Sequence, residues 1–150
     1  MNDPATQLEG FIAKFSGEVA AQARAILARM GQLAPGAISL VYDNYNALAI
    51  GYGATDKQAG LVFSIAVYPR WVSLFFTQGA SLNDPKGLLK GEGRRIRHIV
   101  LCGPGSLDDP DVRMLMTQAL ARAEPTIDAS RPNQLIIQSV SPKQKSRRSA

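Results

Sequence analysis

The chain holds one histidine, His98, and one cysteine, Cys102, and these two counts limit the chemistry that its side chains can perform. A metal site built on two histidines or on several cysteines is excluded, because neither residue type occurs twice. A nucleophilic triad would have to use His98, and no spacing in the chain requires one. General acid–base chemistry by His98, Asp43 or a tyrosine stays open. The sequence thus favours a protein without catalysis, and we assign no metal ligand and no cofactor.

A second set of residues has the chemistry of a binding site. Tyrosine and tryptophan pack an apolar ring while offering one polar atom, and arginine binds carboxylates and phosphates through two parallel hydrogen bonds. These types gather at the expected ends and turns of strands, where we expect them to line one end of a sheet. The candidate ligand-binding residues are Tyr42, Asp43, Asn44, Tyr45, Arg70, Trp71, Arg95, Arg97 and His98.

A structural interpretation of the same residues stays open. Tyrosine hydroxyls anchor turns, arginines keep an edge strand soluble, and a partly buried histidine is commonly a hydrogen-bonded structural residue. Strand alternation places His98 on the face of Ile96 and Val100, opposite Arg95 and Arg97.

The positive charge of the chain is concentrated in its last eight residues. They contain Lys143, Lys145, Arg147 and Arg148 and no acid. Removing these four charges from the formal net charge of +5 leaves +1 for the rest of the chain. We therefore predict a flexible basic tail over residues 141–150 after a single domain over residues 1–140. The four basic residues are the candidate nucleic-acid contacts, since phosphate binding needs clustered Lys and Arg.

The length of 150 residues, with 45% hydrophobic and 19% charged residues, is typical of one globular domain. The N-terminal residues have neither a basic start nor an apolar core, so no signal peptide is predicted. No stretch approaches the ~20 apolar residues that a membrane-spanning helix needs. We expect a cytoplasmic protein that does not enter a membrane.

The order of the elements predicts an α+β fold. Apolar spacing indicates a short helix over residues 8–15 and a second helix from Ser16 to Gly31. A third helix begins near Pro110, with a buried stripe from Val112 to Leu120. Runs rich in β-branched and aromatic residues predict strands at 38–42, 47–52, 61–68, 72–76, 95–101 and 134–140. Short connections favour an antiparallel meander, and an exposed terminal strand would permit a dimer.

Four segments carry a resemblance to a known family. They are VYDNYNALAIGY at 41–52, SIAVYPRWVSLFF at 64–76, GASLNDPKGLLKGEGRRIRHI at 79–99 and IIQSVSPKQKSRR at 136–148. The first three together resemble the YdhG-like domain family of unknown function, and the fourth resembles the C-terminal end of one branch of that family. The resemblance implies N-terminal helices and a C-terminal helix packed on a mainly antiparallel sheet. It assigns no reaction, and it supplies no catalytic residue. Some members of that family are labelled frataxin-like iron chaperones.

Three functions are compatible with these features. The first is a non-catalytic binding or accessory module for an anionic small molecule or a protein partner. The second is a frataxin-like iron-binding chaperone, although the N-terminal region offers only Asp3, Glu9 and Glu18 as acids. The third is a nucleic-acid accessory protein that acts through the basic tail.

Overall fold

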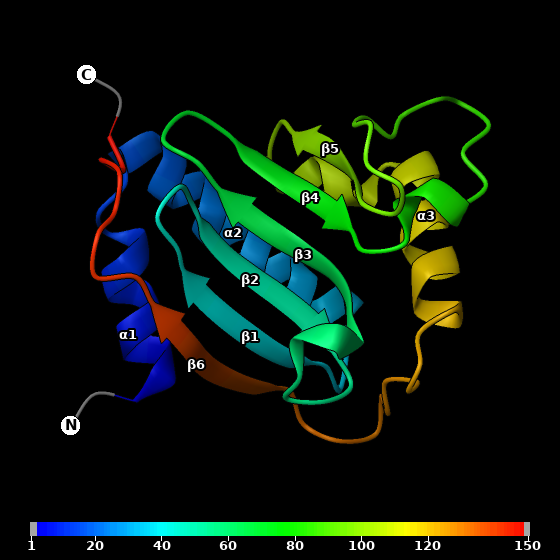
Figure 1. Cartoon of the computed structure of the whole chain (residues 1–150), viewed down its shortest axis with the longest axis horizontal. Coiled ribbons are helices and arrows are strands. Elements are labelled where there is room, and N and C mark those ends of the chain that lie inside the picture. The colour runs from blue at the N-terminus through cyan, green and yellow to red at the C-terminus, as the bar shows by residue number, and fades with distance from the viewer. Residues whose placement is uncertain (1–2, 149–150) are drawn as a thin grey trace.

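The computed structural model describes residues 3–148 and folds them into three α-helices and a six-stranded sheet (Figure 1). The strand order is β5-β4-β3-β2-β1-β6. Every neighbouring pair is antiparallel except β1 and β6, which are parallel. The strands are β1 (Ile38–Asp43), β2 (Leu48–Gly53), β3 (Leu61–Val67), β4 (Val72–Phe76), β5 (Arg97–Leu101) and β6 (Gln134–Val140). The predicted α+β class with a mainly antiparallel sheet is confirmed.

The first two helices begin where side chains cap them. Asp3 accepts a hydrogen bond from the backbone N–H of Thr6 (2.8 Å) and starts α1 (Pro4–Ile12). Ser16 caps α2 (Gly17–Leu33) in the same way through the N–H of Val19. The N-cap predicted at Ser16 is therefore confirmed.

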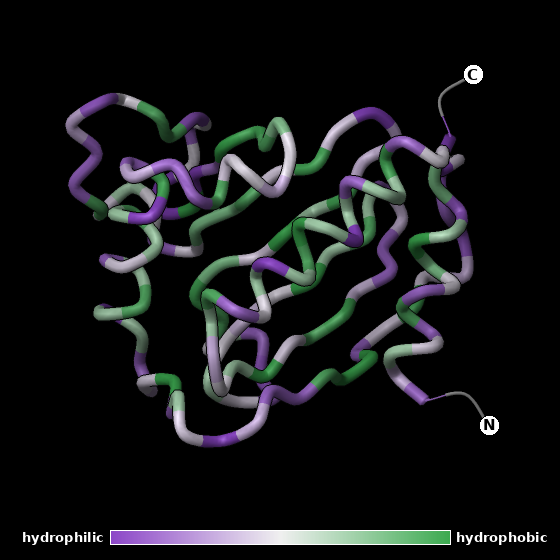
Figure 2. Tube along the Cα trace, turned by 180° about the vertical axis from the view of Figure 1, so that it is seen from behind, coloured by the Kyte–Doolittle hydropathy of each residue, from purple (hydrophilic) through white to green (hydrophobic). Residues whose placement is uncertain are grey.

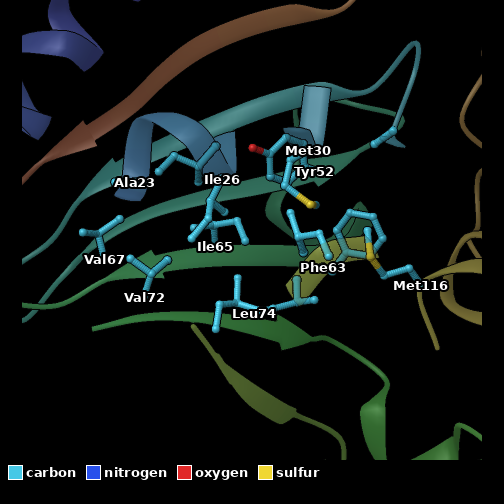
Figure 3. Packing of buried hydrophobic residues seen from close by; sticks show 14 of the residues in the cluster. Ala23, Ile26, Met30, Tyr52, Phe63, Ile65, Val67, Val72, Leu74 and Met116 are labelled. Carbon is cyan, nitrogen blue, oxygen red and sulfur yellow. The ribbon is translucent and has the colours of Figure 1, made fainter. Parts of the chain in front are cut away.

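The core lies between α2 and one face of the sheet. Viewed from behind, α2 crosses that face (Figure 2). Ala23, Ile26 and Met30 of α2 pack over the side chains of the central strands (Figure 3). The strands present alternate residues to this face, and the row Val41, Ile50, Ile65 and Leu74 runs across four strands in register. This burial is the main source of stability.

The third helix packs against the part of the core that contains Phe63 (Figure 3). Asp109 caps α3 (Pro110–Ala121) by accepting from the N–H groups of Asp111 (2.8 Å) and Val112. Met116 of α3 reaches the cluster beside Phe63 (Figure 3). Three short 3-10 turns, Gln58–Gly60, Gly79–Ser81 and Pro104–Asp108, complete the connections.

The last strand is an edge strand, as its sequence predicts. It pairs with β1 in parallel, with a register shift between Val41 and Tyr42, and α1 packs beside it. Within residues 3–148, no helix is long and apolar enough to cross a lipid bilayer.

Candidate functional site

The antiparallel order brings two turns to the same end of the sheet. β1 ends at Asp43 where β2 begins, and β3 ends at Val67 where β4 begins at Val72. The β1–β2 turn and the β3–β4 turn are therefore neighbours, and both carry predicted site residues (Figure 1). The structure thus brings the residues of these two turns to one end of the sheet.

The β3–β4 turn presents a pair of stacked aromatic rings. The N–H of Tyr68 donates to the carbonyl of Trp71 (2.9 Å), which closes a tight turn around Pro69 and Arg70. The closure stacks the two rings, with centroids 4.7 Å apart and planes at 19°. The Trp71 side chain is 42% exposed, so the pair forms a flat aromatic surface that solvent reaches.

The C-terminal segment, residues 141–148, runs along the β1–β2 turn (Figure 1, red). Its backbone is fixed by two hydrogen bonds, from the N–H of Ser141 to the carbonyl of Asp43 (2.8 Å) and from the N–H of Lys145 to the carbonyl of Tyr45 (2.9 Å). The Gln144 amide donates to the Asp43 carbonyl (3.0 Å). The segment is thus packed on the domain.

Arg147 corrects the prediction of a flexible tail for residues 141–148, because it is buried (4% exposed). Residues 149–150 of the predicted tail lie outside the described residues. The guanidinium of Arg147 donates to the carboxylate of Asp43 (2.9 Å) and to the carbonyls of Asn44 and Tyr45, and it lies over the ring of Phe15. A guanidinium with five donors satisfies several acceptors at once, which permits its burial here. The composition of residues 141–148 does not indicate which groups accept hydrogen bonds from Arg147.

Asp43, the carboxylate of this ion pair, is fully buried. Its second oxygen accepts from the ammonium of Lys14 (2.7 Å) at the end of α1. Burial by itself raises the pKa of Asp43, but hydrogen bonds from Lys14, Gln144 and Arg147 outweigh it and hold the pKa below the usual value. Asp43 therefore binds cations of its own chain, and the prediction that it faces a ligand is wrong.

A groove of about 610 Å³ lies between the β3–β4 turn and the C-terminal segment. The turn side contributes Tyr68, Pro69, Arg70 and Trp71, with Asn46 of the β1–β2 turn beside them. The segment side contributes Lys145, Ser146 and Arg148. The volume lies within the range of small-molecule sites.

The groove is lined by positive charge. Arg70, Lys145 and Arg148 are all exposed side chains on its walls, and no Asp or Glu of the described residues lines it. Within residues 3–148, none of these three cations forms an ion pair. The ammonium of Lys145 lies 5.8 Å from the ring centre of Tyr45. The groove therefore combines aromatic surface with uncompensated cations, which suits an anionic ligand. Lys143 is exposed but does not line it.

The β5 residues are not at this end of the sheet. Because β5 is antiparallel to β4, Leu101 pairs with Val72 and Arg97 pairs with Phe76 at the far end. The predicted placement of Arg95, Arg97 and His98 with Trp71 is wrong for this reason. His98 and Val100 do share one face, opposite Arg97, as alternation predicts.

The far-end residues have structural contacts of their own. The guanidinium of Arg97 donates to the carbonyls of Gly93 and Ile96 and ties down the preceding loop. His98 stacks on Phe75 (5.1 Å between ring centres) and exchanges backbone hydrogen bonds with Lys90. Arg95 is exposed and lines another pocket together with Arg94.

Tyr42 and Asn44 belong to a separate pocket of about 370 Å³ on the sheet face that α2 leaves uncovered. Tyr42 points away from Asp43, because neighbours in a strand face opposite sides. Gln58 and Ser64 add polar uncharged groups to its lining. The Tyr42 hydroxyl is buried and has no hydrogen-bond partner among the described residues, and burial raises its pKa.

Several residues of the groove and of its support were not predicted, namely Lys14, Asn46, Gln144 and Ser146. The local signal for the β3–β4 side is the Tyr-Pro-Arg-Trp connection at 68–71. A turn that contains proline between two strands places its flanking residues, Tyr68 and Trp71, side by side.

Comparison with family models, with curated proteins and with solved structures finds no match to this chain. The resemblance to the YdhG-like domain therefore stays a prediction. In the part of the chain that the structure describes, no three His, Cys, Asp or Glu side chains are grouped to hold a metal ion.

Proposed function

We propose that the protein is a non-catalytic binding module whose ligand is a small anionic molecule held in the groove between the β3–β4 turn and residues 145–148. The observation that carries this proposal is the convergence of Arg70, Lys145 and Arg148 on one groove without a carboxylate among its lining residues. Three cations that form no ion pair within residues 3–148 repel each other in one concave site, and an anion relieves that repulsion.

The buried contacts that hold the C-terminal segment in place favour a ligand-binding site over a chance surface depression. Lys145 and Arg148 flank Arg147, whose burial against Asp43 fixes the backbone on both sides of it. A buried charge pair costs desolvation energy, and its retention is compatible with a positioning role. The Asp43–Arg147 pair thus holds Lys145 and Arg148 in the same groove as the Tyr68–Trp71 turn, so that one ligand can contact both.

Two alternatives from the sequence remain predictions. A nucleic-acid accessory role gains one observation, because Lys145 and Arg148 of the basic segment line a groove that also exposes Trp71. The iron-chaperone function has no such observation in its favour. A cytoplasmic location and a dimer are likewise predictions of the sequence.

The proposal is tested by isothermal titration of the full chain with pyrophosphate and with citrate, which represent phosphate and carboxylate anions. We expect binding by at least one of them, and we expect Lys145→Gln and Arg148→Gln each to weaken it about tenfold, the usual effect of losing one charged contact. Arg95→Gln removes the same charge at the far end of the sheet and serves as the matched control.

Two results would overturn the proposal. One is the absence of binding by either anion at millimolar concentration. The other is binding that Arg95→Gln weakens as much as Arg148→Gln does, because the attraction would then belong to the overall charge of the chain.

A further inference from the structure

The aromatic pair at the groove offers a stacking surface to a flat ligand. Tyr68 covers one face of the Trp71 indole at 4.7 Å, and Trp71 is still 42% exposed. The exposed area therefore belongs to the other face and the edges of the indole. An aromatic ring placed there would replace water on a surface that the fold holds rigid through the Tyr68–Trp71 turn.

The cations of the groove come from both of the segments that line it. Arg70 is the residue before Trp71 in the turn, and Lys145 and Arg148 form the facing wall. A ligand that stacks on Trp71 is thus within the same groove as three phosphate-binding side chains. Citrate or pyrophosphate would use the cations alone and would leave the indole surface in contact with water.

The lining also includes two neutral hydrogen-bonding side chains, Asn46 and Ser146. An amide offers a donor and an acceptor to the edge of a heterocycle, and a hydroxyl pairs with a sugar hydroxyl. The volume of about 610 Å³ is suited to one small molecule.

Resting on the proposed anion site, we propose that the ligand is a nucleotide, whose base stacks on Trp71 and whose phosphates bind Arg70, Lys145 and Arg148. The base and the phosphate act together, so neither part alone accounts for the affinity. The same unit occurs free or within a single strand, and both sources share this chemistry.

The chain itself supplies the reporter, because Trp71 is its single tryptophan. Intrinsic fluorescence of the full chain is titrated with adenosine diphosphate, adenosine and pyrophosphate at one fixed salt concentration. Adenosine diphosphate is expected to quench Trp71 and to bind about tenfold or more tighter than pyrophosphate, since base–aromatic stacking adds to the phosphate contacts. Adenosine is expected to bind the weakest.

The outcomes separate this proposal from the anion site on which it rests. Equal affinities for adenosine diphosphate and pyrophosphate overturn the nucleotide and leave the anion site standing. Binding of neither overturns both. A ten-nucleotide adenine strand that binds tighter than adenosine diphosphate keeps the nucleotide chemistry and assigns it to a strand.

Two substitutions at Trp71 test the stacking itself, with calorimetry replacing fluorescence. Trp71→Phe keeps a ring and is expected to retain most of the advantage of adenosine diphosphate over pyrophosphate. Trp71→Leu keeps an apolar side chain without a ring and is expected to abolish that advantage. An advantage of the same size in both variants overturns the role of stacking, and circular dichroism checks that each variant is folded.

Discussion

The carboxylate of Asp43 and the guanidinium of Arg147 lie 2.9 Å apart, and solvent is almost fully excluded from both side chains. The two residues are 104 positions apart, at the end of β1 and in the C-terminal segment. Their contact joins the segment that supplies Lys145 and Arg148 to the sheet whose β3–β4 turn supplies Trp71. We infer that this pair positions one wall of the groove against the other.

Arg147→Met is expected to lower the free energy of unfolding by about 2–3 kcal/mol, as a buried charged hydrogen bond is lost. The loss is limited because Lys14 remains paired with Asp43. Chemical denaturation measures it. Arg148→Met makes the same chemical change at an exposed side chain and is expected to stay within about 0.5 kcal/mol of the wild type. Equal stability of the two variants would contradict the buried contact.

The pH dependence of stability reports on Asp43. Its pKa in the folded protein lies below the usual value, so its contribution to stability is complete above the unfolded-state pKa near 4. The contribution is lost as the pH falls through the lowered folded-state pKa. The stability difference between the wild type and Asp43→Asn is therefore largest at neutral pH and is expected to shrink below about pH 4. A difference that stays constant down to pH 2.5 would show that Asp43 is not stabilised as a carboxylate.

Tyr42→Phe removes a buried hydroxyl that has no partner among the described residues. Because an unsatisfied buried polar group costs free energy, the substitution is expected to leave stability unchanged or to raise it by about 1 kcal/mol. Thermal denaturation of this variant is compared with that of Tyr45→Phe, whose hydroxyl belongs to an exposed side chain. A loss of more than about 1 kcal/mol at Tyr42 alone would reveal a hydrogen bond to its hydroxyl.

Gly36 permits a close approach between two loops. It has φ of +82°, and a Cβ there would lie 1.9 Å from the carbonyl oxygen of Asp128. Gly36→Ala is expected to cost about 2–4 kcal/mol, from the left-handed backbone and the clash together. Gly105→Ala, where no atom lies within 4 Å of the added methyl group, is the control for the same substitution. A similar small cost at both positions would mean that the loops separate easily.

The sequence predicted the sheet better than it predicted the site. The strand at 72–76 and the cap at Ser16 follow from local signals, namely a run of β-branched and aromatic residues and a side-chain hydrogen-bond acceptor. The position of Arg97 follows from strand order, because an antiparallel connection from β4 to β5 places the start of β5 at the end of the sheet opposite Trp71.

The burial of Arg147 could not be predicted in this way. Its neighbours are polar and charged, so composition indicates a solvated tail, and its acceptor Asp43 is distant in sequence. The parallel pairing of β6 with β1 brings the two together, and local patterns do not contain that long-range pairing. The groove depends on the same pairing, which explains why the sequence predicted Lys145 and Arg148 as residues of a tail and not as neighbours of Trp71.

The most direct test of the account is a proton–nitrogen correlation spectrum of the full ¹⁵N-labelled chain during a titration with adenosine diphosphate. The single indole N–H signal belongs to Trp71 and needs no assignment by mutation. We predict that this signal shifts together with the backbone signals of residues 145–148, while those of residues 94–98 stay in place. Shifts confined to residues 94–98, with the indole signal unchanged, would contradict a ligand site between the β3–β4 turn and the C-terminal segment.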